Sequence, residues 1–164
     1  MIEPAVHGNL RGYFMETYNQ KDMEEAGLTM NFVQDNQSSS GKAVLRGLHY
    51  QKKYPQGKLI RVIRGTVFDV AVDIRTESAT YGKWYGIVLS EENKKQFYIP
   101  EGFGHGFLVL SEQADFCYKC TDFYHPDDER GIAWDDPTIH IAWPELDVPY
   151  RMSEKDKQWG RLGE

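Results

Sequence analysis

The alternation of apolar and polar residues predicts β-strands along much of the chain, most clearly in residues 58–75. A mostly apolar run is followed by a turn at Arg64-Gly65, and the arm after the turn alternates between side-chain types. One face of that arm carries Phe68, Val70, Val72 and Ile74, and the other carries Asp69, Ala71, Asp73 and Arg75. We expect a hairpin whose apolar face packs on another sheet or closes a barrel.

Shorter segments of strand composition recur, with turn residues about every eight to twelve positions, which is typical of an antiparallel sandwich or barrel. Residues 37–42 are rich in Ser and Gly and predict a flexible loop, and residues 19–28 predict a short helix capped by Asn19 and ended by Gly27. The further strands are expected over residues 2–6, 11–18, 31–36, 44–51, 84–89, 97–110 and 114–124, with a turn at 7–9 and short strands or turns over 133–137 and 139–144.

Length and charge narrow the class of protein. At 164 residues the chain fits one domain, spanning residues 1–164, that can bury a core. The net charge of −6 argues against nonspecific affinity for nucleic acid or an anionic membrane. No run of about 18 apolar residues predicts a transmembrane helix, and the first residues lack the pattern of a signal peptide. We therefore expect a cytoplasmic protein.

Residues 44–51 combine strand composition with reactive side chains. Arg46 and His49 lie among apolar residues, and Lys58 follows shortly. Arg suits bidentate capture of a phosphate, His suits proton transfer near neutral pH, and Lys suits stabilising an oxyanion. Strict alternation would place Arg46 and His49 on opposite faces, because they are three positions apart. For both to face one pocket, Gly47 must distort the strand, for example as a bulge.

A second histidine lies in a recognisable motif. Pro100-x-Gly102-x-x-His105 matches the second motif of the cupin superfamily, whose members are jelly-roll barrels. Metal-dependent cupins also need a first motif with His-x-His, but here His49 is followed by Tyr50 and Gln51. Two histidines are fewer than the three or four ligands usual for a first-row metal. The motif favours an all-β jelly roll with a few short peripheral helices and a metal-free pocket.

The two cysteines form a C-x-x-C, Cys117 to Cys120, inside an expected strand. A zinc half-site and a redox pair are the functional interpretations. However, no second C-x-x-C or nearby His pair completes a zinc site, and an odd separation puts the two thiols on opposite faces of a strand. We interpret both as structural cysteines.

Many ordered stretches match the pattern of a single family. They are Arg11-Gly-Tyr-Phe with Glu16, Phe32-Val-Gln-Asp-Asn36, Val44-Leu-Arg-Gly-Leu-His-Tyr-Gln51, Gln56-Gly-Lys-Leu59, Phe68-Asp-Val-Ala-Val-Asp-Ile-Arg75, Ile99-Pro-Glu-Gly-Phe103 with His105-Gly-Phe107, Tyr118-Lys119, Gly131-Ile-x-Trp-x-Asp136 and Ser153-x-Lys-Asp156. On these stretches the chain resembles the dTDP-4-dehydrorhamnose 3,5-epimerase family.

The resemblance implies a cofactor-free isomerase acting on a dTDP-linked 4-keto-6-deoxy sugar. Carbons 3 and 5 flank the ketone, so each can lose a proton to give an enolate and regain one on the other face. By resemblance, His49 is the base, Tyr118 is the acid for the other face, and Lys58 is the cation near the ketone oxygen. Asp156 matches the position that pairs with the base, although Ser153-x-x-Asp156 also fits a helix capping box. Asp73 is a second candidate for holding a histidine.

The resemblance also implies substrate contacts and a homodimer. Arg46 is the strongest diphosphate candidate because it can bind two oxygens at once, whereas Arg11 is equally well a solvated edge charge. The implied substrate-binding residues are Arg11, Glu16, Gln34, Asp35, Asn36, Arg46, Lys58, His105, Glu129 and Lys155. Three other functions stay open: an epimerase that inverts one centre, a sugar-nucleotide-binding barrel without turnover, and a metal-dependent cupin.

Overall fold

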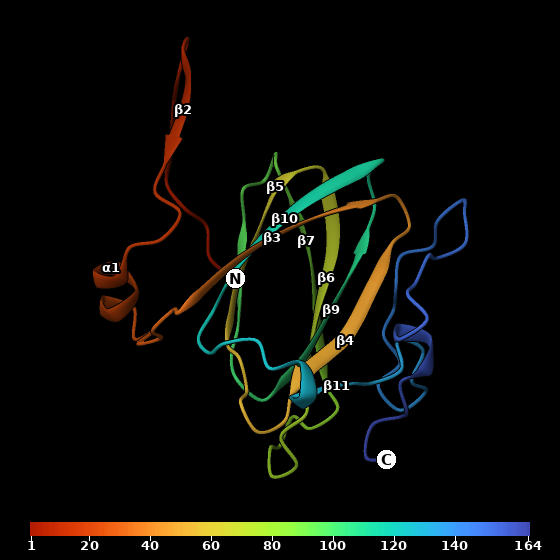
Figure 1. Cartoon of the computed structure of the whole chain (residues 1–164). Helices are drawn as coiled ribbons and strands as arrows, with labels where there is room; N and C mark the ends of the chain where they lie inside the picture. The colour runs from red at the N-terminus through yellow and green to blue at the C-terminus, as the bar shows by residue number, and fades with distance from the viewer.

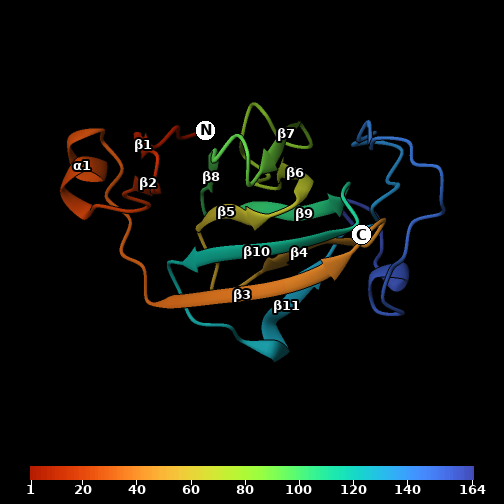
Figure 2. The same cartoon turned by 90° about the horizontal axis from the view of Figure 1, so that it is seen from above.

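The fold consists of two antiparallel sheets that face each other, seen for residues 1–164 in a computed structural model (Figures 1 and 2). One sheet has four strands in the order β3-β10-β5-β8, and the other has five in the order β11-β4-β9-β6-β7. The strands are β3 (Gln34–Gly41), β4 (Leu45–Gln51), β5 (Lys58–Arg64), β6 (Thr66–Asp73), β7 (Trp84–Ser90), β8 (Gln96–Ile99), β9 (Phe103–Val109), β10 (Gln113–Cys120) and β11 (Glu129–Gly131). The predicted all-β jelly-roll class is confirmed. No helix in the structure is long and apolar enough to cross a membrane.

An apolar core fills part of the space between the sheets. Ile60 comes from the four-stranded sheet and Val109 from the five-stranded sheet, and both are fully buried in the same cluster. Burial of such a side chain contributes about 1.5–3 kcal/mol. Phe107 and Phe116 belong to this cluster and also line a pocket between the sheets, so the core directly supports the pocket wall.

The predicted hairpin over residues 58–75 does not form. β5 pairs with β10 and β8, whereas β6 pairs with β7 and β9, so the turn at Gly65 carries the chain from one sheet to the other. Gly65 has a φ of 75°, and a Cβ there would lie 2.0 Å from the carbonyl oxygen of Gln113. The turn was predicted correctly, but alternation alone does not show which strands pair.

The expectation that the apolar face of this arm packs on another sheet is wrong, because that face of β6 points away from the space between the sheets. Val70 and Val72 pack with Ile139 from the C-terminal segment, in a cluster separate from the core. The opposite face of β6 carries Val67, which joins the core, and Asp69, which is fully buried. The polar face of the predicted strand is therefore the one that looks inward, and it brings a carboxyl group into the interior.

Residues 37–41 belong to β3 rather than to a flexible loop. They pair with β10 in a continuous register from Gln34↔Cys120 to Gly41↔Gln113. Backbone hydrogen bonds hold this strand, so its Ser-rich composition does not prevent pairing. Residues 133–144 contain turns and no strand, whereas β11 was not expected.

The N-terminal part lies outside the sandwich, on the side away from the C-terminal segment (Figure 1). β1 (Val6–Asn9) and β2 (Gly12–Met15) form a projecting hairpin, so residues 7–9 are strand rather than the expected turn. The expected strand over 2–6 is reduced to a bridge between Ile2 and Gln96.

The predicted short helix is present as α1 (Gln20–Glu25). Asn19 caps it as expected, because its side-chain oxygen accepts a hydrogen bond of 3.1 Å from the backbone N–H of Lys21. Gly27, with a φ of 79°, follows its last turn.

Candidate active site

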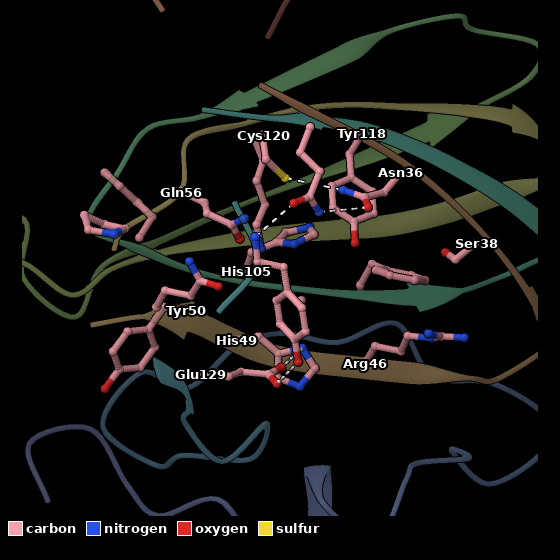
Figure 3. Close-up of a pocket in the computed structure, with 18 of the residues that line it drawn as sticks. Asn36, Ser38, Arg46, His49, Tyr50, Gln56, His105, Tyr118, Cys120 and Glu129 are labelled. Atoms are coloured by element: carbon pink, nitrogen blue, oxygen red, sulfur yellow. Dashed lines mark hydrogen bonds and ion pairs between the residues drawn. The ribbon is translucent and has the colours of Figure 1, made fainter. Parts of the chain in front are cut away.

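A pocket of about 340 Å³ lies between the two sheets. Its lining includes eight of the residues that the sequence singled out, and these come from both sheets. They are Gln34, Asn36, Arg46, His49, Lys58, His105, Tyr118 and Glu129. Figure 3 shows His49 and Tyr118 reaching into this space from opposite walls. The lining also includes Ser38, Tyr50, Gln51, Gln56, Phe103, Phe107, Phe116, Cys120 and Tyr124.

An irregularity at Gly47 turns both Arg46 and His49 toward the pocket. The pairing of β4 with β9 shifts register between these two residues, as predicted. Gly47 has a φ of 118°, and a Cβ there would lie 2.6 Å from the Cα of Gly106 and 2.7 Å from the carbonyl oxygen of His105. Only glycine fits this close approach of two strands without strain.

His49 is held from behind by Asp156. The Nε2–H of His49 donates to Oδ1 of Asp156, while Ser153 Oγ donates to its Oδ2 at 2.9 Å and Trp159 Nε1 to its Oδ1 at 3.4 Å. Burial raises the pKa of Asp156, but the hydrogen bonds from His49 and Ser153 outweigh it and leave the pKa below its usual value. An ionised Asp156 fixes the proton on Nε2 and leaves Nδ1 of His49 as the basic nitrogen.

The capping box that the sequence suggested is present only in part. The backbone N–H of Asp156 donates to Ser153 Oγ at 3.1 Å, but the 3-10 helix that begins at Asp156 has Lys155 as its N-cap, without a side-chain cap bond. The contacts with Ser153 nevertheless hold the carboxylate in place beside the histidine.

The free nitrogen of His49 faces a second carboxylate. Oε1 of Glu129 lies 3.9 Å from Nδ1 of His49. The other oxygen of Glu129 accepts from the hydroxyl of Tyr124 at 2.8 Å and from Nζ of Lys155 at 2.5 Å. Burial raises the pKa of Glu129, but the hydrogen bonds from Lys155 and Tyr124 lower it by more than burial raises it. The group is therefore anionic near neutral pH.

Tyr118 and Lys58 come from neighbouring strands on the other wall. They project from β10 and β5, which pair side by side. Burial raises the pKa of Tyr118, so its phenol keeps its proton near neutral pH. Burial also lowers the pKa of Lys58, although the charges of Cys120, Asp69 and Glu129 oppose the shift.

His105 has a buried carboxyl partner that the sequence did not reveal. Its Nε2 lies 3.0 Å from Oδ2 of Asp69 and 3.1 Å from Oδ1. Burial lowers the pKa of His105 and raises that of Asp69, and each is opposed by the other's charge. The imidazole also stacks on Phe116 at 6.0 Å between ring centres, so its orientation in the pocket is fixed. The sequence analysis expected the apolar face of β6 to look inward, so it did not place Asp69 beside His105.

Some predicted residues lie elsewhere. Asp35 alternates with its pocket-lining neighbours, faces outward and forms an ion pair of 2.7 Å with Lys119. Arg11 and Glu16 lie at either end of the projecting hairpin strand, away from this pocket. Lys155 reaches the site through Glu129 rather than through the lining.

The suggestion that Asp73 holds a histidine is wrong. Asp73 accepts from Nε and Nη2 of Arg75 at 2.9 and 2.7 Å, and from Ser78 and Thr80 at 2.6 Å each. These bonds place its pKa well below the usual range. Asp73 therefore organises the turn after β6.

The two cysteines are both free thiols and point to opposite faces, as their spacing predicted. Cys120 is buried in the pocket wall and Cys117 lines a groove on the outer face of the sheet. No group of three or more His, Cys, Asp or Glu side chains is arranged so that it could hold a metal ion.

Comparison with known proteins agrees with this geometry. A family model described as dTDP-4-dehydrorhamnose 3,5-epimerase matches residues 1–164. The chain belongs to the dTDP-4-dehydrorhamnose 3,5-epimerase family. A family member of that name from Methanothermobacter thermautotrophicus is 56% identical over 165 residues, which cover 100% of this chain and 89% of the relative.

Solved structures of the family are also similar. The dTDP-6-deoxy-D-glucose-3,5-epimerase from Legionella pneumophila, in complex with dTDP-4-keto-L-rhamnose, is 54% identical with a TM-score of 0.95, covering 98% of this chain and 85% of that one. A 3'-monoepimerase from Streptomyces bikiniensis, in complex with dTDP-quinovose, is 32% identical with a TM-score of 0.91, covering 98% and 82%. The family's fold thus accommodates enzymes described as inverting two centres and as inverting one.

Proposed function

We propose that this chain is a cofactor-independent epimerase that converts dTDP-4-dehydro-6-deoxy-D-glucose to dTDP-4-dehydro-L-rhamnose by inverting C3 and C5. The observation that carries the proposal is the position of His49 and Tyr118 on opposite walls of one pocket, with Lys58 also in its lining. An inversion through an enolate needs a base on one face of the sugar, an acid on the other and a positive charge near the oxygen. Membership of the family and the identity to the relatives support the same substrate class.

The proposed mechanism assigns one role to each group. Nδ1 of His49 removes the proton from a carbon next to the ketone, and the electron pair of that C–H bond moves onto the ketone oxygen. The ammonium group of Lys58 stabilises the enolate oxygen. The double bond then takes the proton of the Tyr118 hydroxyl on the other face, which restores the ketone and inverts the centre. Asp156 stabilises the imidazolium that forms in the first step.

The remaining pocket groups suit the polar parts of a nucleotide sugar. Arg46 presents a guanidinium that donates to Ser40 Oγ at 2.9 Å and has further N–H groups for a diphosphate. Gln34 and Asn36 are linked by a hydrogen bond of 3.0 Å, so their remaining polar groups are held in fixed positions at the pocket wall. We propose that these three residues and His105 contact the substrate.

Incubation with the thymidine-linked 4-keto sugar in heavy water, followed by NMR of the product, tests this function. We expect deuterium at both C3 and C5 and inversion of both centres. Deuterium at C3 alone would instead identify a single-centre epimerase, the alternative that the similarity to the 3'-monoepimerase favours. Substrate binding with no exchange at either carbon would identify a binding protein and refute both activities.

We further propose a homodimer in which the β1–β2 hairpin contacts the second copy. The hairpin carries exposed apolar side chains, among them Leu10, Tyr13 and Phe14, and Phe14 is 68% exposed. Such a patch is typical of an interaction surface. Arg11 lies on the same hairpin and away from its own pocket, so it suits a contact with substrate bound to the partner.

Mixing two inactive variants tests this assembly. If the pocket of one copy uses Arg11 of the other, a mixed dimer of His49→Ala and Arg11→Ala chains has one intact site. We expect each variant alone to be weakly active and the refolded mixture to regain activity. A monomer by sedimentation, or no recovery on mixing, would refute the arrangement.

Two further properties are proposals of the same kind. Residues 1–164 are taken to act as one catalytic domain. Limited proteolysis followed by an activity assay tests this.

A diphosphate sugar does not cross an apolar bilayer unaided, so the enzyme must share a compartment with its substrate. We propose that this compartment is the cytoplasm, and cell fractionation tests it.

A further inference from the structure

Inverting two centres with one base and one acid creates a requirement for proton exchange; this inference rests on the proposed function. Each inversion leaves His49 with one extra proton and Tyr118 with one fewer. A second inversion on the same bound sugar needs a neutral imidazole and a protonated phenol again. The site must therefore release one proton and take up another between the two inversions.

We propose that Glu129 carries the proton of His49 to solvent and so resets the base between the two inversions. Its Oε1 lies 3.9 Å from Nδ1 of His49, the nitrogen that Asp156 leaves free. A shift of the carboxylate by about 1 Å closes this gap to hydrogen-bonding distance. Figure 3 shows the two side chains next to each other at the pocket wall formed by β4 and β11.

The two hydrogen-bond partners of Glu129 are more exposed to solvent than Glu129 itself. The Glu129 side chain is 13% exposed, whereas that of its partner Lys155 is 53% exposed. Tyr124, its other partner, is also exposed. Both partners bind Oε2 and leave Oε1 for the imidazole. The proton passes from Nδ1 to Oε1, and the neutral carboxyl group then gives it to a water molecule or a buffer base, which restores the carboxylate.

The other acidic partner of His49 does not offer such a route. The Asp156 side chain is only 5% exposed, and its two oxygens are occupied by His49, Ser153 and Trp159. Asp156 is also on the Nε2 side, where the proton is permanent. Glu129 is thus the carboxylate that lies near both the nitrogen whose protonation changes and the open side of the site.

The experiment compares wild type with Glu129→Gln, which keeps the shape and removes the charge. Turnover and the ratio of singly to doubly inverted product are measured at low buffer concentration and again with added imidazole. Glu154→Gln is the matched control, because Glu154 is 81% exposed and pairs only with Lys157. Binding of dTDP to each variant is measured by calorimetry to show that the pocket is intact.

We expect Glu129→Gln to lose about 10²-fold in turnover at low buffer, near the lower end for a positioned proton-transfer group. Singly inverted product should accumulate, and imidazole should restore both rate and product ratio, while the control and wild type respond little. A loss that imidazole does not relieve, or a weaker affinity for dTDP with an unchanged product ratio, would overturn the relay and identify Glu129 as a substrate contact only. Absence of exchange by wild type would overturn the proposed function itself.

Discussion

Replacing Gly47 with alanine tests the idea that this glycine shapes the active site. The new Cβ would meet the Cα of Gly106 at 2.6 Å and the carbonyl oxygen of His105 at 2.7 Å, and both are backbone atoms that cannot rotate away. A φ of 118° adds strain for any residue with a side chain. Backbone strain of about 1–3 kcal/mol and overpacking of about 1–3 kcal/mol together lower the free energy of unfolding by about 2–6 kcal/mol.

The measurement is urea and thermal unfolding of Gly47→Ala beside Gly41→Ala. Gly41 lies in β3, where a Cβ would meet nothing closer than 3.8 Å, so its substitution should change stability by about 0.5 kcal/mol or less. A loss of about 4 kcal/mol lowers the melting temperature by roughly 8–16 °C in a chain of this size. Turnover should fall as well, because relief of the clash moves Arg46 and His49. A Gly47→Ala protein within about 1 kcal/mol of wild type, with normal activity, would refute the reasoning.

Three other predictions concern charged groups. Burial lowers the pKa of Lys58, so the alkaline limb of the pH–rate profile should fall at a lower pH than for an ordinary lysine. Lys58→Arg stays charged and should extend that limb to higher pH, whatever its maximal rate. An unchanged limb would count against Lys58 as the cation that stabilises the enolate. Asp156→Asn should reduce turnover about 10²–10⁴-fold in initial-rate assays, because His49 loses its orienting carboxylate; near-normal turnover would contradict this. Because the pKa of Asp73 is lowered in the folded state, its bonds to Arg75 stabilise the fold fully above the ordinary carboxyl pKa, and this stability is lost as pH falls through the lower folded pKa. In urea unfolding over a pH series, the free energy of unfolding of Asp73→Asn should therefore fall less steeply at acid pH than that of wild type. An identical slope would refute this prediction.

The class of fold followed from local pattern, whereas most of the pocket residues followed from the resemblance to a family. Alternation identified β6, and the three-residue spacing of Arg46 and His49 required a distortion at Gly47, which the register shift provides. The expectation that the apolar face of β6 looks inward was wrong, because the distant C-terminal segment covers that face instead.

The sequence also failed to predict which side chains far apart in the chain bind each other. The carboxyl partner of His105 proved to be Asp69 on an adjacent strand, and Asp73, four positions later, turned out to bind a neighbouring arginine instead. The contact of Tyr124 with Glu129 depends on the path of the loop after β10, for which the sequence carries no simple periodic signal. The role of Asp156 was foreseeable only through family resemblance, since its local motif predicts a cap.

The C-terminal segment covers the outer apolar face of β6 and also supplies Asp156. A ribosome therefore completes all strands of the sandwich before it makes the carboxylate that orients the imidazole. A chain that ended before the C-terminal segment would have all its strands, but the apolar outer face of β6 would be exposed and His49 would lack its orienting carboxylate. Covering of the apolar face and orientation of the imidazole thus depend on the same C-terminal segment.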